Sequence, residues 1–500
     1  MTTAVAMGSA WNFAGQVAAL AVSFVTIPFV IRLLGSEGYG VLVLVVLIPT
    51  YFAFADFGMG VASTKFESEA HARGDRDREG NVLRASALIA LVATSVIALP
   101  IILLATKIVE QLNVPAEWET TASYALRITA VTFVIGALAS VLNSPMLARL
   151  RMDLNAFATA LPKVLYSGGA PVALALGFGL VGVANWLLIT SIVGLIVVIA
   201  ISGKLLPELF GSKIDRSLFA PLMRFGAGWL FAVMAVMLLV NLEKLLLARM
   251  VSVQTLAYYS IAFTFANTAL FLPQAITQTL LPAFARLLGT ERHDEFQTLF
   301  VRTLRVSLLI QLPALTLMAV VARPLFRVWA GGEFEANSTW PFYVLLAGTL
   351  FNILASVPHS VILSAGRTEL LAKLYWAQLL VYPFVAAALI YNFGIIGAAA
   401  AWSLRVAVDS ILMNLICRRV AKVRTAVSHA AARLALPTLL LLPAFATAMV
   451  FSDHYVWIVA VALISLLSYA ILAWRISLDE DERAWLRRKI ARPSGRSLQP

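Results

Sequence analysis

Apolar stretches of about twenty residues alternate with short polar connections along almost the whole chain. A transmembrane α-helix needs about 20 mostly apolar residues to cross the hydrocarbon core of a bilayer. The pattern predicts about fourteen such helices, at residues 11–31, 39–57, 85–107, 124–147, 156–176, 181–201, 225–245, 257–284, 304–321, 339–363, 372–391, 397–416, 434–451 and 456–474. We therefore expect an all-α integral membrane protein.

The composition agrees with a lipid environment. Hydrophobic residues make up 61% of the chain and charged residues 13%, with a mean hydropathy of +0.88. A soluble domain carries about 25% charged residues, so the composition excludes a large water-soluble helical protein. Cys417 is the single cysteine, which excludes a disulfide framework and a cysteine-based metal cluster. No group of His, Cys and carboxylate residues has metal-ligand spacing, and we expect no cofactor.

The basic residues predict the orientation in the membrane. They collect in alternate connections, at residues 65–84, 149–151, 204–224, 286–302, 367–373 and 418–433, and again in the tail at 483–496. The opposite connections are poorer in Lys and Arg; residues 109–121 contain three glutamates and no basic residue. Because Lys and Arg favour the cytoplasmic side, we expect both termini in the cytoplasm of a bacterial inner membrane. Since the charge is spread over many short loops, the net charge of +12 does not indicate a nucleic-acid partner.

The two ends and the loops limit the function further. Residues 1–9 contain no Lys or Arg and precede a full-length apolar stretch, so we expect no cleavable signal peptide. Every connection is shorter than about thirty residues, which is too short to fold into a catalytic domain. The sequence thus predicts a protein that acts within the membrane and is not an enzyme.

An internal duplication relates the two halves. Residues 138–141, Leu-Ala-Ser-Val, recur as residues 354–357. In that register the following pairs match: Ser144 with Ser360, Arg151 with Arg367, Asp153 with Glu369, Tyr166 with Tyr382, Trp186 with Trp402 and, after a one-residue slip, Gly179 with Gly394. We expect two parallel six-helix lobes, 1–215 and 216–425, followed by two more helices in 426–475 and a cytoplasmic tail, 476–500. Transporters built from such repeats bind substrate between them.

Several short motifs occur in a fixed order. The first is Ile27-Pro28 followed by Arg32-Leu-Leu-Gly-Ser-Glu-Gly-Tyr-Gly40; the second is Ala55-Asp-Phe-Gly-Met-Gly60 with Lys65 after it. Asn241-Leu-Glu-Lys244, Tyr258-Tyr-Ser260 and Leu281-Pro-Ala-Phe284 complete the set. With these motifs the chain resembles the polysaccharide and O-antigen flippases of the multidrug/oligosaccharidyl-lipid/polysaccharide exporter superfamily, through about residue 416. Glu243 and Lys244 depart in residue type, though not in charge, from that family's Asp-Arg-like pattern.

The resemblance implies a fold and a transport function. It implies a V-shaped bundle that moves an undecaprenyl-diphosphate-linked oligosaccharide from the cytoplasmic to the outer leaflet by alternating access. The implied partners are this lipid-linked oligosaccharide, membrane lipid and other membrane proteins of polysaccharide assembly. Two alternatives stay open: another exporter of the superfamily, either a peptidoglycan-precursor flippase or a cation-coupled drug antiporter, and a membrane-embedded glycan polymerase or ligase.

Charges within membrane helices are costly, so each is a candidate functional group. Arg405 and Asp409 are four residues apart and share one helix face. Arg405 is a candidate ligand for a diphosphate, with Asp409 as its counter-ion, because a guanidinium suits bidentate binding of phosphate. A self-neutralised pair that stabilises the bundle fits the same residues.

Two further charged pairs have both a functional and a structural interpretation. Glu243 and Lys244 are candidates for a gating ion pair, but we expect their side chains to extend to the outer interface instead. Asp56 and Lys65 flank the inner mouth of the second helix and are candidates for a cytoplasmic latch. For Asp56 we favour a turn with Gly58 and Gly60, and Lys65 stays open.

The remaining candidates are polar groups at helix ends or within helices. The simplest interpretation of Arg151 and Arg367 is that they fix the orientation of the helices in the membrane. As a repeat-related pair they would also attract a phosphate headgroup at the cytoplasmic entrance. Asn12 and Gln278, like Gln16 and Gln274, are candidate partners for sugar hydroxyls. Hydrogen bonding between helices explains them equally well.

Overall fold

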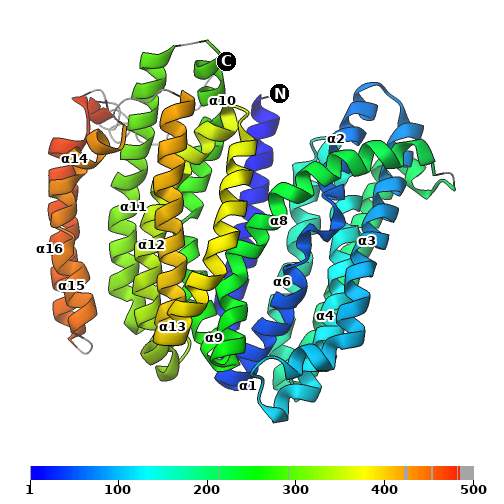
Figure 1. Ribbon diagram of the computed structural model, residues 1–500, viewed down its shortest axis with the longest axis horizontal. Helices are drawn as coiled ribbons and strands as arrows, with labels where there is room; N and C mark the ends of the chain where they lie inside the picture. Colours follow the sequence, from blue (N-terminus) through cyan, green and yellow to red (C-terminus); the bar gives the residue numbers. More distant parts are fainter. Residues whose placement is uncertain are drawn as a thin grey trace, which may run out of the picture. The chain divides into compact units, whose positions relative to one another are not determined.

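The computed structural model describes residues 2–212, 214–290, 292–421, 426–451, 454–480 and 482–484. These residues are helical almost throughout, and no strand occurs among them (Figure 1). The first helices are α1 (Thr2–Thr50), α2 (Met59–Ala72), α3 (Arg76–Glu110), α4 (Ala116–Leu142), α5 (Ser144–Ala148), α6 (Met152–Ala175), α7 (Gly179–Leu205) and α8 (Phe219–Met250). They are followed by α9 (Val253–Thr268), α10 (Phe271–Gly289), α11 (His293–Trp329), α12 (Gly332–Ser364), α13 (Thr368–Ala421), α14 (Ala426–Leu439), α15 (Leu442–Val450) and α16 (Tyr455–Leu472). Short 3₁₀ turns lie at η1 (Ala53–Asp56), η2 (Pro207–Phe210) and η3 (Arg216–Leu218), and η4 (Ala473–Ser477) is a single π-helical turn.

The helices confirm an all-α, multi-pass membrane protein of about fourteen helices. Among the described residues, nine helical segments are long and apolar enough to cross a bilayer. Two long helices each contain two of the predicted spans, because α1 is kinked at Gly35 (φ 72°) and α13 at Gly394 (φ 55°). Glycine has no Cβ and adopts such positive φ angles without a steric penalty, so it ends one span and starts the next.

The outward faces are apolar, as lipid contact requires. On α3 the side chains of Val96, Leu99 and Leu103 are between 56% and 70% exposed. In a soluble protein such a row would be an aggregation hazard, whereas in a bilayer the acyl chains cover it. The helices therefore pack on one face and meet lipid on the other.

The backbone supports the predicted duplication. Leu150 precedes Arg151 and Gly366 precedes Arg367, and both preceding residues have a positive φ, 55° and 71°. The matched glycines, Gly179 and Gly394, also agree, with φ of 57° and 55°. A left-handed conformation is uncommon for a leucine. Both halves thus have a left-handed residue at the corresponding position, as a duplication would produce.

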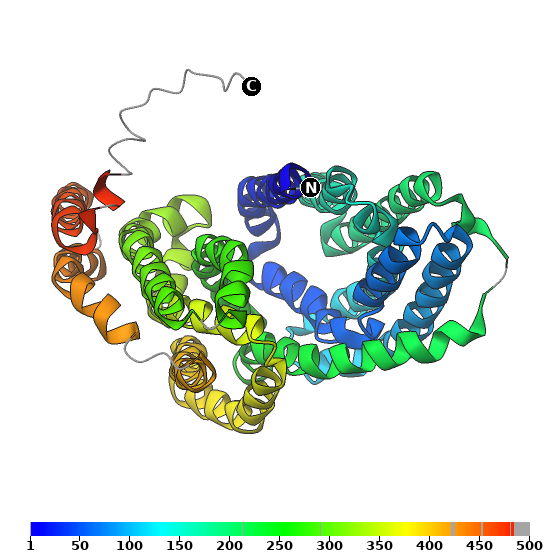
Figure 2. The same cartoon turned by 90° about the horizontal axis from the view of Figure 1, so that it is seen from above.

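The chain forms two compact units, each described here by itself. The first contains the described parts of Met1–Ser260 together with Leu374–Ala398, and the second contains those of Ile261–Lys373 and Ala399–Pro500. These units do not coincide with the two predicted lobes, 1–215 and 216–425. The reason is that α8, which begins the second half of the sequence, packs on α2, α3 and η1 of the first half (Figure 2).

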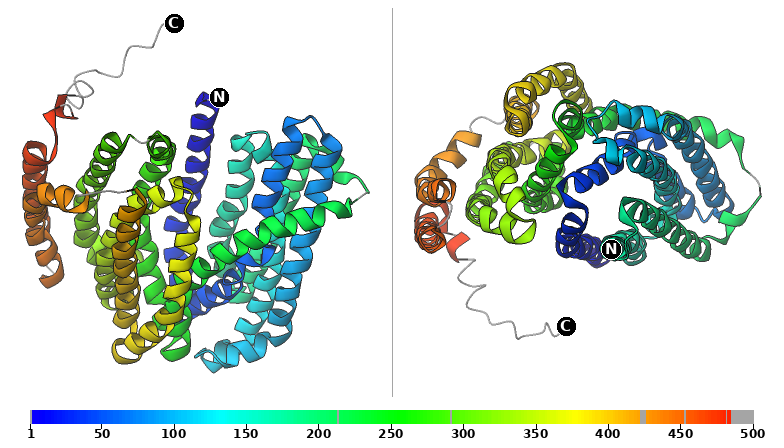
Figure 3. Two further views of the ribbon diagram at one scale, coloured as in Figure 1. Left: turned by 45° about the horizontal axis from the view of Figure 1, so that its top comes forward. Right: turned by 90° about the horizontal axis from the view of Figure 1, so that it is seen from below.

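Each unit has its own apolar core. In the first, residues of α2, α3, α5 and α8 meet around Met59, Val82, Leu83, Met146 and Leu222, all at most 1% exposed. In the second, α15 and α16 pack on α11, with Ala444, Ala448 and Ile458 against Val320. The two C-terminal helices thus lie beside α11 (Figure 3).

Candidate functional site

A tight turn positions the start of α2. The backbone N–H of Gly58 donates to Asp56 Oδ1 at 2.8 Å. Phe57 and Gly58 both have positive φ, 54° and 62°, so the helix is sharply broken between η1 and α2. This confirms the turn interpretation of Asp56. Gly60 has a different role from the predicted one: it lies inside α2, where a Cβ would come within 2.8 Å of Ser140 Oγ, so it permits close packing against α4.

A polar cavity lies beside this turn, within the first unit. Its volume is about 550 Å³. Most of the polar lining is neutral: Thr64 and Ser68 come from α2, Ser140 from α4, and Asn143 from the end of α4. Asp56 and Lys65 are the two charged residues in the lining. The hydroxyls of Thr64 and Ser68 donate to backbone carbonyls of α2, so they can accept hydrogen bonds from sugar hydroxyls.

Lys65 is held at the edge of this cavity by aromatic rings. Its Nζ lies 5.0 Å from the ring centroid of Phe66 and 4.7 Å from that of Phe225. Glu69 Oε1 is 4.0 Å away, and the Lys65 side chain is 48% exposed. A cation over an aromatic face is attracted by the ring quadrupole, so the ammonium is positioned without being neutralised.

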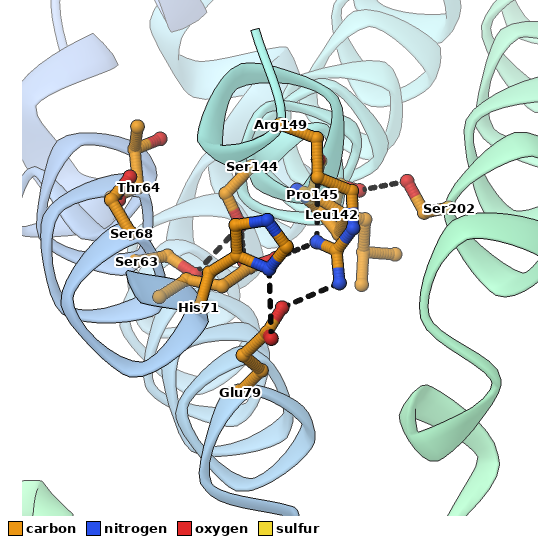
Figure 4. Close-up of polar contacts among 11 residues, drawn as sticks. Ser63, Thr64, Ser68, His71, Glu79, Leu142, Ser144, Pro145, Arg149 and Ser202 are labelled. Carbon is orange, nitrogen blue, oxygen red and sulfur yellow. Dashed lines mark hydrogen bonds and ion pairs between the residues drawn. The ribbon is translucent and has the colours of Figure 1, made fainter. Parts of the chain in front are cut away.

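A buried ion-pair cluster, which we call the Arg149 cluster, joins α2, α3 and α5 (Figure 4). Arg149 donates to Glu79 Oε2 at 2.5 Å and to Glu67 Oε1 at 3.4 Å. Ser144 donates to Glu67 Oε2 at 2.6 Å, and His71 Nδ1 lies 3.1 Å from Glu79 Oε1. The side chains of Glu67 and Glu79 are 0% exposed.

The charge count of the Arg149 cluster is unusual. Two buried carboxyl groups share one guanidinium, and the imidazole of His71, which is 43% exposed, lies beside Glu79. Sequence analysis assigned Arg149 only to topology and did not select Glu67 or Glu79. The one available signal was the presence of these acidic residues inside a connection rich in Lys and Arg.

Another buried carboxylate lies in α8. Glu243 is 0% exposed and accepts hydrogen bonds from the hydroxyls of Tyr259, at 3.3 Å, and Tyr382, at 3.1 Å. The expectation that this side chain extends to the outer interface is therefore wrong. Lys244 also stays close to the helix, donating to Asn241 Oδ1 at 3.0 Å. The tyrosines satisfy the carboxylate inside the unit, so exposure is not needed.

Arg151 and Arg367 form the same local ion pair in each half. Arg151 contacts Asp153 at 2.8 Å, and Arg367 contacts Glu369 at 2.5 Å. Hydrogen bonds from Arg151 hold the pKa of Asp153 below its usual value. Each arginine already has a carboxylate partner two residues on, which weakens the expectation that the two arginines attract a phosphate headgroup.

Arg405 and Asp409 are not among the residues that line the polar cavity. Both lie on α13 within the second unit, and Asp409 is buried. The side chains of Asn12 and Gln278 lie outside the part of the chain that the structure describes. Within that part, no group of three or more His, Cys, Asp or Glu residues is arranged to hold a metal ion.

The comparisons with a protein family and with individual proteins agree with one another. The family described as "Polysaccharide biosynthesis protein" matches residues 5–288. A Shigella flexneri protein named for O-antigen transport is 24% identical over 419 residues, which cover 83% of this chain and 98% of that protein.

Solved structures share the fold. An inward-facing multidrug resistance MATE transporter of the MOP superfamily matches with a TM-score of 0.67 and 14% identity, covering 82% of this chain and 99% of that one. The lipid II flippase MurJ, in an inward closed conformation, matches with a TM-score of 0.63 and 15% identity, covering 97% and 100%. At these identities the likeness is one of fold.

Proposed function

The chain belongs to the polysaccharide biosynthesis protein family, and from this membership we propose that it flips a lipid-linked oligosaccharide across the bacterial inner membrane. The cargo is an undecaprenyl-diphosphate-linked oligosaccharide, which moves from the cytoplasmic to the outer leaflet by alternating access for surface polysaccharide synthesis. In this proposal both termini lie in the cytoplasm, and other membrane proteins of polysaccharide assembly supply and consume the cargo.

The observation that carries the proposal is the polar cavity of the first unit. A glycan can leave water for a helical bundle only where hydrogen-bonding groups replace its hydration. The cavity offers such groups from Thr64, Ser68, Ser140 and Asn143, with Lys65 at its edge.

The cavity favours a glycan over the cargo of the alternative exporters. A carrier of organic cations needs acidic and aromatic groups in its cavity, and here Asp56 is the one acid among the lining residues, with its Oδ1 accepting the N–H of Gly58. A polymerase or ligase needs groups that make or break covalent bonds. The match to a protein named for O-antigen transport supports movement without covalent change.

Deletion of the gene tests the proposal. In a strain without redundant flippases, we expect surface polysaccharide to be lost and the lipid-linked oligosaccharide to accumulate on the cytoplasmic leaflet, where an added glycosidase cannot reach it in intact spheroplasts. Expression of the wild-type chain should restore both. Normal surface polysaccharide in the deletion strain would refute the transport function, and a covalently altered glycan would support the polymerase alternative.

A further inference from the structure

A second cavity lies against the first and shares one residue with it, Lys65. It has a volume of about 500 Å³ and is lined by Lys65, Phe66, Ala220, Pro221, Arg224 and Phe225. Its walls come from α2 and from the first turns of α8, both within the first unit. Arg224 does not belong to any of the sequence motifs by which the chain resembles the flippase family.

Close helix packing creates this cavity. Gly226 faces the turn before α2, and a Cβ there would collide with the carbonyl oxygen of Phe57. Phe66 and Phe225 then meet edge to face, with ring centroids 6.0 Å apart and an interplanar angle of 85°. The Lys65 ammonium lies over both rings, and Arg224 lines the cavity from α8.

The lining has two cations and no carboxylate. Among the described residues, Lys65 forms one ion pair, with Glu69. It is a long one, with 4.0 Å between Lys65 Nζ and Glu69 Oε1. No ion pair of 4.0 Å or less joins Arg224 to a carboxylate in the same described residues. The positive charge of the cavity is thus largely uncompensated, and an anion with several oxygens is the natural complement.

The neighbouring cavity indicates what is attached to that anion. Lys65 belongs to both linings, and on its other side lie the hydroxyl and amide groups of Thr64, Ser68, Ser140 and Asn143. A phosphate against Lys65 and Arg224 would place a sugar attached to it within reach of these groups. The phenylalanine rings and Pro221 offer an apolar surface for the start of a lipid chain.

Resting on the proposed function, we propose that Lys65 and Arg224 bind the phosphate group of a membrane lipid at the cytoplasmic end of the first unit. The lipid is either the lipid-linked oligosaccharide, with its first sugar in the polar cavity, or an ordinary anionic phospholipid of the inner leaflet. Both present the same phosphate chemistry, and binding measurements separate them.

The test uses the purified full-length protein in detergent and a synthetic polyprenyl diphosphate that carries one N-acetylhexosamine. Lys65→Gln and Arg224→Gln should each weaken its binding about tenfold or more, because a hydrogen bond to a charged group contributes about 1.5–3 kcal/mol. Lys65→Arg should stay within about threefold of the wild type, since it keeps the charge. Lys204→Gln is the matched control, an exposed cation of the same unit that lines neither cavity, and it should bind normally.

Competition identifies the source of the phosphate. If excess phosphatidylglycerol does not displace the probe, the site binds the lipid-linked sugar. If phosphatidylglycerol displaces the probe, and both Gln variants also bind phosphatidylglycerol more weakly, the site binds phospholipid headgroups. Either result supports a phosphate site. The proposal is overturned if both Gln variants bind the probe like the wild type, or if a polyprenol without phosphate competes as well as the probe.

Failure of the site and failure of the transport function give different results. Normal binding by the Gln variants, with loss of surface polysaccharide in the deletion strain, would refute the site and leave the transport function. Weakened binding by the variants, with normal surface polysaccharide in the deletion strain, would leave a lipid phosphate site in a protein of another function. Lys65 is 48% exposed and Arg224 is exposed, so neither substitution removes a core contact.

Discussion

Two ion-pair clusters, one in the described part of each compact unit, join helices that are distant in the sequence, and they are built oppositely. In the first unit, the Arg149 cluster places two buried carboxylates, Glu67 and Glu79, on one guanidinium. In the second unit, the tail cluster places three arginines around two acids: Arg305 contacts Asp479 and Glu482, Arg302 contacts Glu482, and Arg433 contacts Asp479. The first cluster has an excess of acid and the second an excess of base.

Both clusters have a buried centre, since Arg305 and Glu482 are each 6% exposed, but their other members differ in burial. Arg149 is 11% exposed and its partners are fully buried, whereas Arg302, Arg433 and Asp479 are each just over 50% exposed. A buried charge that loses its partner is strongly destabilising, while exposed pairs contribute little and are screened by salt. We infer that the Arg149 cluster stabilises the fold of α2, α3 and α5, and that the tail cluster attaches Asp479 and Glu482 to α11 and α14.

Arg149→Met should have the largest effect. It leaves Glu67 and Glu79 buried without their common cation, and the expected loss of stability is roughly 3–5 kcal/mol. Thermal unfolding of the detergent-solubilised protein measures it. Arg151→Met, which removes an exposed arginine two residues away, is the control and should melt close to the wild type. Equal melting of both variants would show that the Arg149 cluster has no stabilising role.

Arg305→Ala should have the next largest effect. Arg305 and Glu482 are each about 6% exposed, so the substitution leaves a nearly buried carboxylate with only Arg302 beside it. We expect a loss of about 1–3 kcal/mol, confined to the C-terminal segment. Limited proteolysis should cut the tail faster than in the wild type, and the melting of the rest of the protein should change little. Protection of the tail in the variant would contradict the attachment.

Acidification should release the tail without any mutation. Hydrogen bonds from Arg305, and then from Arg433, lower the pKa of Asp479 from 3.8 to about 2. Because the folded pKa is the lower one, the stabilisation is complete above about pH 4 and is lost as the pH falls toward 2. The rate of tail cleavage by an acid-active protease should rise across that range. In Asp479→Asn the rise should be absent, since that side chain does not titrate.

Arg433→Ala should have the smallest effect. The Arg433–Asp479 pair is half exposed on both sides, so we expect about 0.2–1 kcal/mol or less. High salt should remove the difference between variant and wild type, because the Debye length shortens to about 3 Å at 1 M. Tail proteolysis at low and high NaCl measures this. A large, salt-independent loss would mean that Arg433 packs as well as pairs.

The sequence by itself determined the membrane helices and the breaks between them. Apolar periodicity is a local property, and the glycines at 35 and 394 end spans wherever the chain folds. The turn at Asp56 was likewise predictable, because Asp56 bonds to a backbone group only two residues on. The matched pairs Arg151–Asp153 and Arg367–Glu369 also formed locally.

Only the tertiary structure decided which polar side chains meet. Glu67 and Arg149 are 82 residues apart, and Glu243 and Tyr382 are 139 apart. Lys65 reaches Phe225 only because α8 packs on α2, across the predicted boundary between the halves. A helical pattern tells which face of a helix is polar, but not which other helix that face will contact. That choice depends on the packing of the whole bundle, and it changed Glu243 from an expected interfacial residue into a buried one.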